Sequence, residues 1–214
     1  MRRDAARLVF GCASVLLSYP GDPAPGDPAP GDLAAVRAAL GRLPHGAARA
    51  RLEEAVSWLA SMTPAGAAAL YVETFDLDRR RALHLTYYRH GDTRERGMAL
   101  ATVAAAYRAA GLRVQPGELP DFLPALLELA AVSPEGTAVL KAHRAAIEAL
   151  RRGLDEIASP WSSVVASVTD ALGPASRADS DALHRYRAEG PPSERVGLEP
   201  FAPPEVATGE VVAR

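Results

Sequence analysis

Apolar side chains recur at intervals of three and four residues along most of this chain, and this spacing limits the folds open to it. The first such run contains Leu8, Val9, Cys12, Val15, Leu16 and Tyr19. Residues three and four apart lie on one face of an α-helix, so the run predicts a helix with one apolar face. No segment shows the convincing apolar–polar alternation of a half-buried strand. The pattern therefore predicts an all-α fold.

Local helix-start signals divide the chain. Thr63-Pro64, Ser133-Pro134 and Ser159-Pro160 each place a hydroxyl at the N-cap and a proline at the first helical position. Together with the apolar periodicity they predict eight or so helices in one bundle-like domain, the short 82–88 segment making a ninth. Their approximate limits are 4–19, 33–43, 46–61, 64–76, 82–88, 93–110, 121–131, 134–157 and 160–172.

Two segments fall outside this pattern. Residues 20–31 repeat Gly-Asp-Pro-Ala-Pro, and proline removes backbone donors and fixes φ, so we expect an extended linker there. Residues 176–214 are polar and then rich in proline, which predicts a disordered tail. The domain prediction is thus a single helical domain over residues 1–175, followed by that tail.

Charge and cysteine content exclude several classes of protein. Lysine and arginine total 24 against 26 acidic residues, a net charge of −2, which argues against a nucleic-acid-binding protein. The only cysteine, Cys12, can form neither an internal disulfide nor a thiolate metal site, and we expect it to be a small buried residue. No apolar run reaches the ~18 residues of a membrane span. We expect a cytoplasmic protein with no membrane insertion.

No motif for catalysis is evident. The five histidines lack zinc-site spacing, and the glycine-rich phosphate loops and the Gly-x-Ser-x-Gly pattern are absent. His143 lies on an apolar helix face and is interpreted as a buried histidine with its hydrogen bonds satisfied, in preference to a ligand. Five carboxylates could pair as general acid and base, but their spacing singles out no pair and no nucleophile stands beside one: Glu73, Asp76, Asp78, Asp92 and Asp121. We therefore expect no enzymatic activity; a nucleotide hydrolase using Arg94 or Arg96 remains an alternative.

Two blocks carry a resemblance to a known family. The first is YVETFDLDRRRALHLTYYRHGDTRERGMAL, residues 71–100, and the second is GELPDFLPALLELAA, residues 117–131. Together they cover 45 of the 214 residues. Both blocks, in this order and at this separation, resemble the NarJ-type nitrate reductase assembly chaperones of the wider TorD-like group.

The resemblance implies an all-α cytoplasmic chaperone that does no chemistry on a substrate. Its partner would be the apo form of the nitrate reductase α (catalytic) subunit, including the N-terminal segment of that subunit. The chaperone would hold this client competent for insertion of the molybdenum cofactor (bis-MGD) before membrane docking, and would bind no cofactor stably itself. Molybdenum cofactor biosynthesis proteins are further candidate partners. The alternative within the group is a chaperone of a different molybdoenzyme.

Helix-in-groove recognition uses an apolar floor with polar rims, and the first block supplies both. The predicted client-binding residues are Tyr71, Glu73, Phe75, Asp76, Tyr87, Tyr88, Arg94, Arg96 and Asp121. The residues predicted to be structural in the loops are Gly91, Asp92, Gly97 and Pro124. If the function is correct, Tyr71, Tyr88 and Arg96 should share one hollow.

Several of these residues also have purely structural interpretations. Phe75 and Tyr87 could be core residues. Asp92, followed by Glu95, could cap a helix in a capping box, and the Asp121 carboxylate could cap the helix that begins at Leu-Pro-Asp. The arginines Arg94 and Arg96 could lock the loop internally, to Asp76 or to Asp121, instead of reaching a client.

Overall fold

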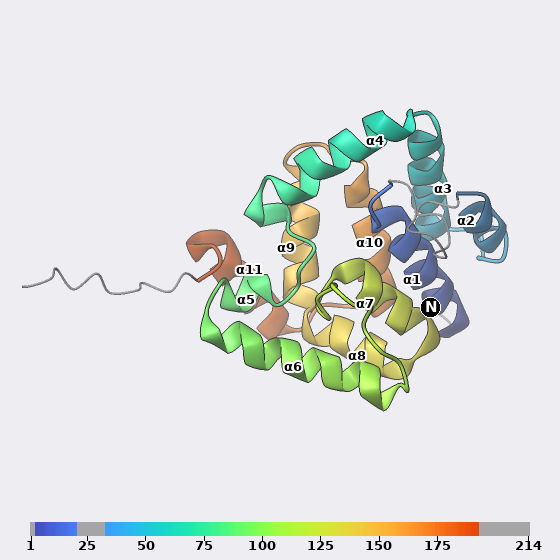
Figure 1. Cartoon of the computed structure of the whole chain (residues 1–214). Helices are drawn as coiled ribbons and strands as arrows, with labels where there is room; N and C mark the ends of the chain where they lie inside the picture. The colour runs from blue at the N-terminus through green and yellow to red at the C-terminus, as the bar shows by residue number, and fades with distance from the viewer. Residues whose placement is uncertain (1–2, 21–32, 193–214) are drawn as a thin grey trace, which may run out of the picture.

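The computed structural model describes residues 3–20 and 33–192, and these ranges fold into helices (Figure 1). The elements in chain order are α1 (Arg3–Leu17), α2 (Leu33–Leu40), α3 (Ala47–Ala60), α4 (Pro64–Tyr71), the π-helix η1 (Val72–Asp76), the 3₁₀ helix η2 (Arg79–Arg81), α5 (Tyr87–His90), α6 (Arg94–Ala109), α7 (Leu123–Val132), α8 (Pro134–Ala142), α9 (Arg144–Asp155), α10 (Trp161–Leu172) and α11 (Arg177–Glu189). Over these ranges no strand is formed, and the prediction of an all-α bundle is confirmed.

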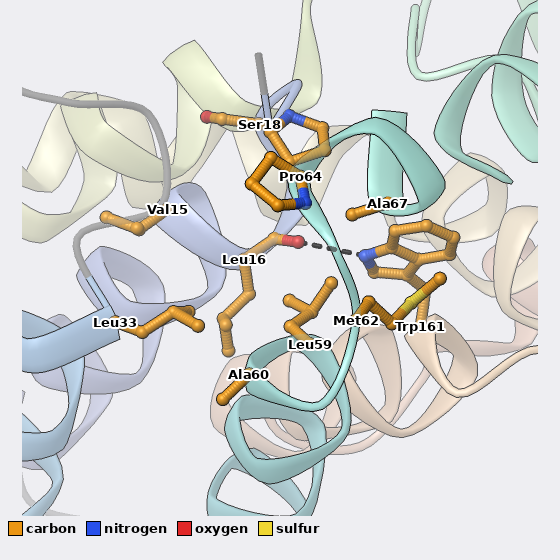
Figure 2. Close-up of a pocket in the computed structure, with 11 residues that line it drawn as sticks. Val15, Leu16, Ser18, Leu33, Leu59, Ala60, Met62, Pro64, Ala67 and Trp161 are labelled. Carbon is orange, nitrogen blue, oxygen red and sulfur yellow. Dashed lines mark hydrogen bonds between the residues drawn. The ribbon is translucent and has the colours of Figure 1, made fainter. Parts of the chain in front are cut away.

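The core is built around α1 and α10. Helix α1 packs against α7 and α10, and α10 packs in turn against α3 and α9. The Trp161 ring is 1% exposed, and its Nε1–H donates a hydrogen bond of 2.9 Å to the carbonyl of Leu16, which ties α10 to the end of α1 (Figure 2). Burial of a large apolar side chain stabilises a fold by ~1.5–3 kcal/mol. The apolar face predicted for the first helix is thus the one that fills the centre.

Two of the three predicted helix starts are confirmed. The Thr63 hydroxyl accepts from the Gly66 N–H, and the Ser133 hydroxyl accepts from the Glu135 N–H. The third is wrong in its capping residue: α10 begins at Trp161 with Pro160 at the N-cap and no side-chain cap. Pro160 has helical φ and ψ, so the turn before α10 is closed by backbone hydrogen bonds instead.

The long helix predicted over residues 134–157 is two helices. His143 breaks it with φ −105° and ψ 18°, and its ring Nδ1 lies 3.0 Å from the Val139 carbonyl oxygen. The hydrogen bond expected for this histidine is therefore present. Burial lowers the pKa of its imidazole, because the charged form loses hydration there.

A glycine allows α8 to lie close against α7. A Cβ atom added at Gly136 would lie 2.4 Å from the Ala130 nitrogen, closer than any real contact. The obstruction is backbone, which cannot turn aside as a flexible side chain would. The α7–α8 crossing therefore depends on the missing side chain.

The prediction of a disordered segment over residues 176–214 is wrong for residues 177–189, which form α11. The Ser176 and Asp179 side chains make a reciprocal capping box at its start, and the helix packs on α9 (Figure 1, left). Ser176-x-x-Asp179 is a helix-start signal in the sequence, but the polar composition of the segment favours disorder and led to the wrong prediction. Most of the Pro-Ala-Pro linker, residues 21–32, and the tail from residue 193 lie outside the described residues.

The lengths and compositions of the helices show whether any of them could cross a membrane. Within residues 3–20 and 33–192, no single helix is both long and apolar enough to cross a membrane. Ala47–Ala60 and Pro64–Asp76 meet the length and composition criteria only as a pair, and that pair bends by 117° at its break.

Candidate functional site

Backbone hydrogen bonds join the two sequence blocks. The Leu85 N–H donates to the Asp121 carbonyl at 3.1 Å, and the Leu123 N–H donates to the Leu83 carbonyl at 2.8 Å. These bonds form an isolated antiparallel bridge between His84 and Phe122. The helix predicted over residues 82–88 is wrong for this reason: the chain forms the bridge at His84, turns at residues 85 and 86, and enters α5 only at Tyr87. Segments 36 to 40 residues apart in the sequence therefore meet.

Asp121 lies at the centre of this junction and is fully buried, with 0% exposure. Its carboxylate accepts hydrogen bonds from the Thr86 N–H at 3.1 Å and from the Thr86 hydroxyl at 2.5 Å, and it lies 3.1 Å from His84 Nδ1. Burial raises the pKa of this carboxyl, but the hydrogen bonds from His84 and Thr86 outweigh burial and lower it. Asp121 therefore acts as a buried anion that holds the first block to the second.

The helix-cap interpretation of Asp121 is wrong. Helix α7 begins at Leu123 with Phe122 as its N-cap, and no side chain caps it. The carboxylate faces the other sequence block instead, because the bridge at His84 and Phe122 brings Thr86 within reach.

Arg96 connects the buried anion to the surface turn. Its NH2 lies 3.7 Å from Asp121 Oδ2, its Nε donates to the Thr86 hydroxyl at 3.3 Å, and its NH1 lies 3.5 Å from Asp92. The guanidinium also stands 5.6 Å from the centre of the Tyr87 ring, within the range of a cation–π contact. The alternative in which Arg96 locks the loop to Asp121 is thus confirmed.

The turn between α5 and α6 requires glycine at residue 91. Gly91 has φ +54°, and a Cβ there would lie 1.6 Å from the carbonyl oxygen of Pro192, beyond α11. The expected Asp92 cap is wrong, since Thr93 is the N-cap of α6 and Asp92 is exposed. The Thr93 hydroxyl donates to the His90 carbonyl at 2.7 Å and closes the turn from the other side.

The other two residues expected to shape the loops lie in helices. Gly97 is inside α6, and a Cβ there would meet nothing within 4 Å. Pro124 is buried in the first turn of α7, and its carbonyl accepts a hydrogen bond of 2.8 Å from the Ser14 hydroxyl of α1. Pro124 thus helps to fix the second block on the core, whereas the structure shows no packing requirement at Gly97.

A hollow of about 330 Å³ lies beside the junction, and we call it the signature hollow. It is bounded by η1, η2, the start of α5, the turn before α6 and the residue before α7. Five of the predicted client-binding residues line it, together with one predicted loop residue: Tyr71, Phe75, Asp76, Tyr87, Arg96 and Asp92. Tyr71 and Arg96 therefore share one hollow as expected, but Tyr88, expected in the same hollow, does not line it.

The floor of the signature hollow belongs to the core. Tyr71 and Phe75 are each 4% exposed, with ring centres 4.8 Å apart, and both rings contact Trp161. The Tyr71 hydroxyl donates to the Leu17 carbonyl at 3.1 Å, and burial raises its pKa. Tyr87 is 8% exposed. The rings are buried parts of the core that also line the hollow. The interpretation of Phe75 and Tyr87 as core residues is therefore correct, and both also face the hollow.

The remaining predicted client-binding residues do not line the signature hollow. Glu73 on η1 and Arg94 at the start of α6 are exposed, and Asp121 is buried beside the hollow at the junction. Tyr88 is 3% exposed and faces elsewhere; its hydroxyl lies 3.0 Å from the carbonyls of Arg80 and Ala82. Neighbouring residues Tyr87 and Tyr88 thus serve different sides of α5.

Three residues of the site were missed by sequence reasoning. His84, Arg79 and Phe122 line the signature hollow, and Arg79 lies 3.7 Å from Asp92 across its rim. No sequence signal marks them, because their positions follow from the bridge between the two blocks. Thr86, which receives and gives hydrogen bonds at the centre of the junction, carries no motif either.

The site offers no evident cofactor chemistry. Over the described residues, no group of three or more His, Cys, Asp or Glu side chains could hold a metal ion. A separate apolar pocket of about 250 Å³ lies between α1, α3 and α10, with Leu16, Leu59 and Trp161 in its wall (Figure 2). None of the predicted site residues lines that pocket. The signature hollow has aromatic rings below and charged groups at the rim.

Comparison with known proteins shows which family this chain belongs to. The family profile described as "Nitrate reductase delta subunit" matches residues 42–167, more than half of the chain. The chain belongs to the nitrate reductase delta subunit family. The match contains both sequence blocks and every residue of the signature hollow. The NarJ-type resemblance read from those blocks is therefore confirmed.

Named relatives in this family are similar over different lengths. The chain is 41% identical over 163 residues to the nitrate reductase-like protein NarX of Mycobacterium tuberculosis (strain CDC 1551 / Oshkosh), covering 75% of the chain but only 24% of that protein. It is 30% identical over 159 residues to the probable nitrate reductase molybdenum cofactor assembly chaperone NarJ of Bacillus subtilis (strain 168), covering 74% of the chain and 81% of the relative. Identity to the Escherichia coli (strain K12) chaperone NarJ is 42% over 81 residues, which cover 38% of the chain and 34% of that protein.

Proposed function

We propose that this protein is an assembly chaperone for respiratory nitrate reductase. It binds the apo form of the catalytic α subunit, including the N-terminal segment of that subunit, and keeps it competent for insertion of the molybdenum cofactor. It acts in the cytoplasm before the enzyme docks on its membrane anchor. It is not an enzyme, and it handles the cofactor only through the client.

Family membership and the names of the B. subtilis and E. coli relatives support this role, since both are called nitrate reductase molybdenum cofactor assembly chaperones. The single structural observation that carries the proposal is the signature hollow, where two distant sequence blocks place aromatic rings under a charged rim. A rigid aromatic floor gives contact area without the entropic cost of freezing flexible side chains. The Arg96 and Asp121 contacts hold that floor and rim in one geometry before a client arrives.

The rim supplies the polarity needed to orient a peptide. Asp76 and Asp92 present carboxylates, and Arg79 and Arg96 present guanidinium groups, around the same hollow. Asp76 is exposed and makes no hydrogen bond or ion pair with the described residues. A basic side chain of the client can therefore pair with Asp76 without breaking an internal contact.

Binding is tested by isothermal titration calorimetry of the full-length protein with purified apo α subunit and with a peptide of its N-terminal segment. We expect Asp76→Lys to weaken binding at least tenfold, because it reverses a rim charge that no internal contact uses. The matched control is Glu54→Lys, a charge reversal at an exposed position of α3 far from the hollow along the chain. Equal affinity of both variants and the parent would remove the hollow from the proposal, and absence of any complex would end the proposal itself.

The cellular test measures metal content. In nitrate-respiring cells that lack this protein, the α subunit should be synthesised but contain little molybdenum by mass spectrometry of the purified enzyme. Normal molybdenum content would contradict the assembly role. Reintroduction of the Asp76→Lys variant should restore less molybdenum than reintroduction of Glu54→Lys.

A further inference from the structure

The described part of the chain ends against the turn that borders the signature hollow. Pro192 is the last described residue, and its carbonyl oxygen would lie 1.6 Å from a Cβ placed on Gly91. Asp92, the residue after Gly91, lines the signature hollow. Residues 193–214, which we call the C-terminal tail, therefore start beside the rim of that hollow.

The sequence of the C-terminal tail contains a short proline-rich run around one aromatic residue. The run is Glu-Pro-Phe-Ala-Pro-Pro over residues 199–204, and Phe201 is the only aromatic residue of the chain outside residues 3–20 and 33–192. Closely spaced prolines favour the extended polyproline II conformation. Such segments are recognised in grooves lined with aromatic rings, because their preformed conformation loses little entropy on binding. The sequence of the tail therefore calls for an aromatic surface.

The signature hollow offers that surface. Four aromatic side chains from α4, η1, α5 and the residue before α7 line it: Tyr71, Phe75, Tyr87 and Phe122. The groove that Pro192 itself lines, between α5, α6 and α11, has two tyrosines, Tyr88 and Tyr186, and is otherwise rich in alanine. The rim of the signature hollow carries two carboxylates and two guanidinium groups, so net charge does not select its occupant. The aromatic rings do.

The C-terminal tail is also long enough to reach this hollow. Phe201 follows Pro192 by nine residues, and an extended chain spans about 3.3 Å per residue, so Phe201 can reach points up to about 30 Å from Pro192. A short tether raises the effective concentration of the attached segment to about the millimolar range. Even a weak site beside Pro192 is therefore occupied by the tail for much of the time.

We propose that the C-terminal tail docks in the signature hollow, with Phe201 and its neighbouring prolines on the aromatic rings, and that it competes there with the client. The tail covers the aromatic floor when no client is bound, and the client has to displace it. The docking concerns this chain alone, whereas the competition rests on the proposed function. The two parts are tested separately.

Docking is tested by photocrosslinking in the full-length protein, with Phe201 replaced by p-benzoylphenylalanine. The matched control carries the same group in place of Val212, eleven residues further along the tail and outside the proline-rich run. We expect an intramolecular adduct from residue 201 that mass spectrometry places within residues 71–96 or at Phe122. An adduct in the groove between α6 and α11, an adduct to a second copy of the chain, or no adduct would overturn the proposal. Equal adducts in the hollow from both positions would also overturn it.

Competition is tested by isothermal titration calorimetry of the full-length protein with purified apo α subunit. Apparent affinity falls with the fraction of molecules whose hollow is free. We expect Phe201→Ala to bind the client at least about threefold more tightly than the parent, the gain for a hollow that the tail covers two-thirds of the time. Val212→Ala is the control and should bind as the parent does.

The outcomes separate the two proposals. If the parent and Phe201→Ala bind the client equally, competition by the tail is refuted while the proposed function stands. If the client binds none of the three proteins, the proposed function fails, and the crosslink from residue 201 alone decides whether the tail docks.

Discussion

Removal of the Asp121 carboxylate is the sharpest test of how the two sequence blocks are held together. In the variant Asp121→Ala, the Thr86 N–H, the Thr86 hydroxyl and the His84 ring lose their shared acceptor inside the protein. The guanidinium of Arg96, 3.7 Å away, loses its innermost anion. The groups left behind are buried or half-buried, so water cannot replace the acceptor without opening the junction.

The expected size of the effect follows from the burial of Asp121, which is complete. Breaking a buried, hydrogen-bonded ionic contact by deleting one partner costs about 3–5 kcal/mol. Domains are stable by only about 5–15 kcal/mol, so this is a large fraction of the total. For a chain of this length the melting temperature should fall by roughly 10 °C. The milder variant Asp121→Asn keeps an acceptor oxygen and should cost about 2–3 kcal/mol.

The same network predicts a pH dependence with a definite sign. The folded-state pKa of Asp121 lies below its unfolded value, because hydrogen bonds from His84 and Thr86 outweigh burial. A depressed carboxyl pKa contributes stability that is complete above the unfolded value, about 4, and is lost as pH falls through the folded value. The stability difference between the parent and Asp121→Asn should therefore be largest near neutral pH and shrink below pH 4.

The measurement is urea unfolding followed by circular dichroism at several pH values. The matched control is Asp92→Asn, which removes a carboxylate 3.5 Å from the same arginine, Arg96, but one that is 61% exposed. An exposed pair contributes only about 0–1 kcal/mol. If Asp121→Ala costs no more than Asp92→Asn, or if the difference between the parent and Asp121→Asn grows as pH falls below 4, the account of a buried anion joining the blocks is refuted.

Three further outcomes are expected. Gly136→Ala should lower the free energy of unfolding by at least about 2 kcal/mol in urea unfolding, because its Cβ would strike the α7 backbone. Gly97→Ala, whose Cβ would lie in open space, should be neutral or stabilise the fold by up to about 1 kcal/mol. The reverse order would contradict the packing. Cys12 should resist a thiol reagent at pH 8 until the protein unfolds, because burial raises its pKa to about 11; rapid native-state labelling would contradict this. Burial lowers the pKa of His143. The greater stability of the parent relative to His143→Gln should therefore be present above about pH 6.5 and shrink below it. A stability difference that stays constant across about pH 5–8 would contradict a lowered pKa at His143.

Features with a local cause could be predicted from the sequence. The Thr63 and Ser133 caps depend on neighbours within three residues, and both occur as expected. Gly111, directly after the C-cap of α6, has φ +73°, the left-handed conformation in which glycine commonly ends a helix. The apolar faces of the helices were also evident, since helical periodicity is a property of short windows. The all-α fold follows from these together.

Features that depend on contacts between distant parts of the chain could not be predicted from the sequence. Asp121 reads locally as a helix cap, and only the pairing with a segment 35 residues earlier gives its carboxylate a different set of donors. Tyr87 and Tyr88 are adjacent and similar, and their assignment to opposite sides of α5 depends on where α5 begins. The break at His143 separates α8, which packs on α7, from α9, which packs on α10 and α11, and no short window contains those contacts.

The position of α1 has a consequence for how this domain can be handled as a module. The family match starts at residue 42, yet α1, residues 3–17, places seven buried side chains against α7 and α10. An excised fragment that follows the match would expose that apolar surface to water and to other chains. Any fusion protein or minimal domain boundary chosen for expression therefore has to include α1, although a boundary drawn from the family match alone would omit it.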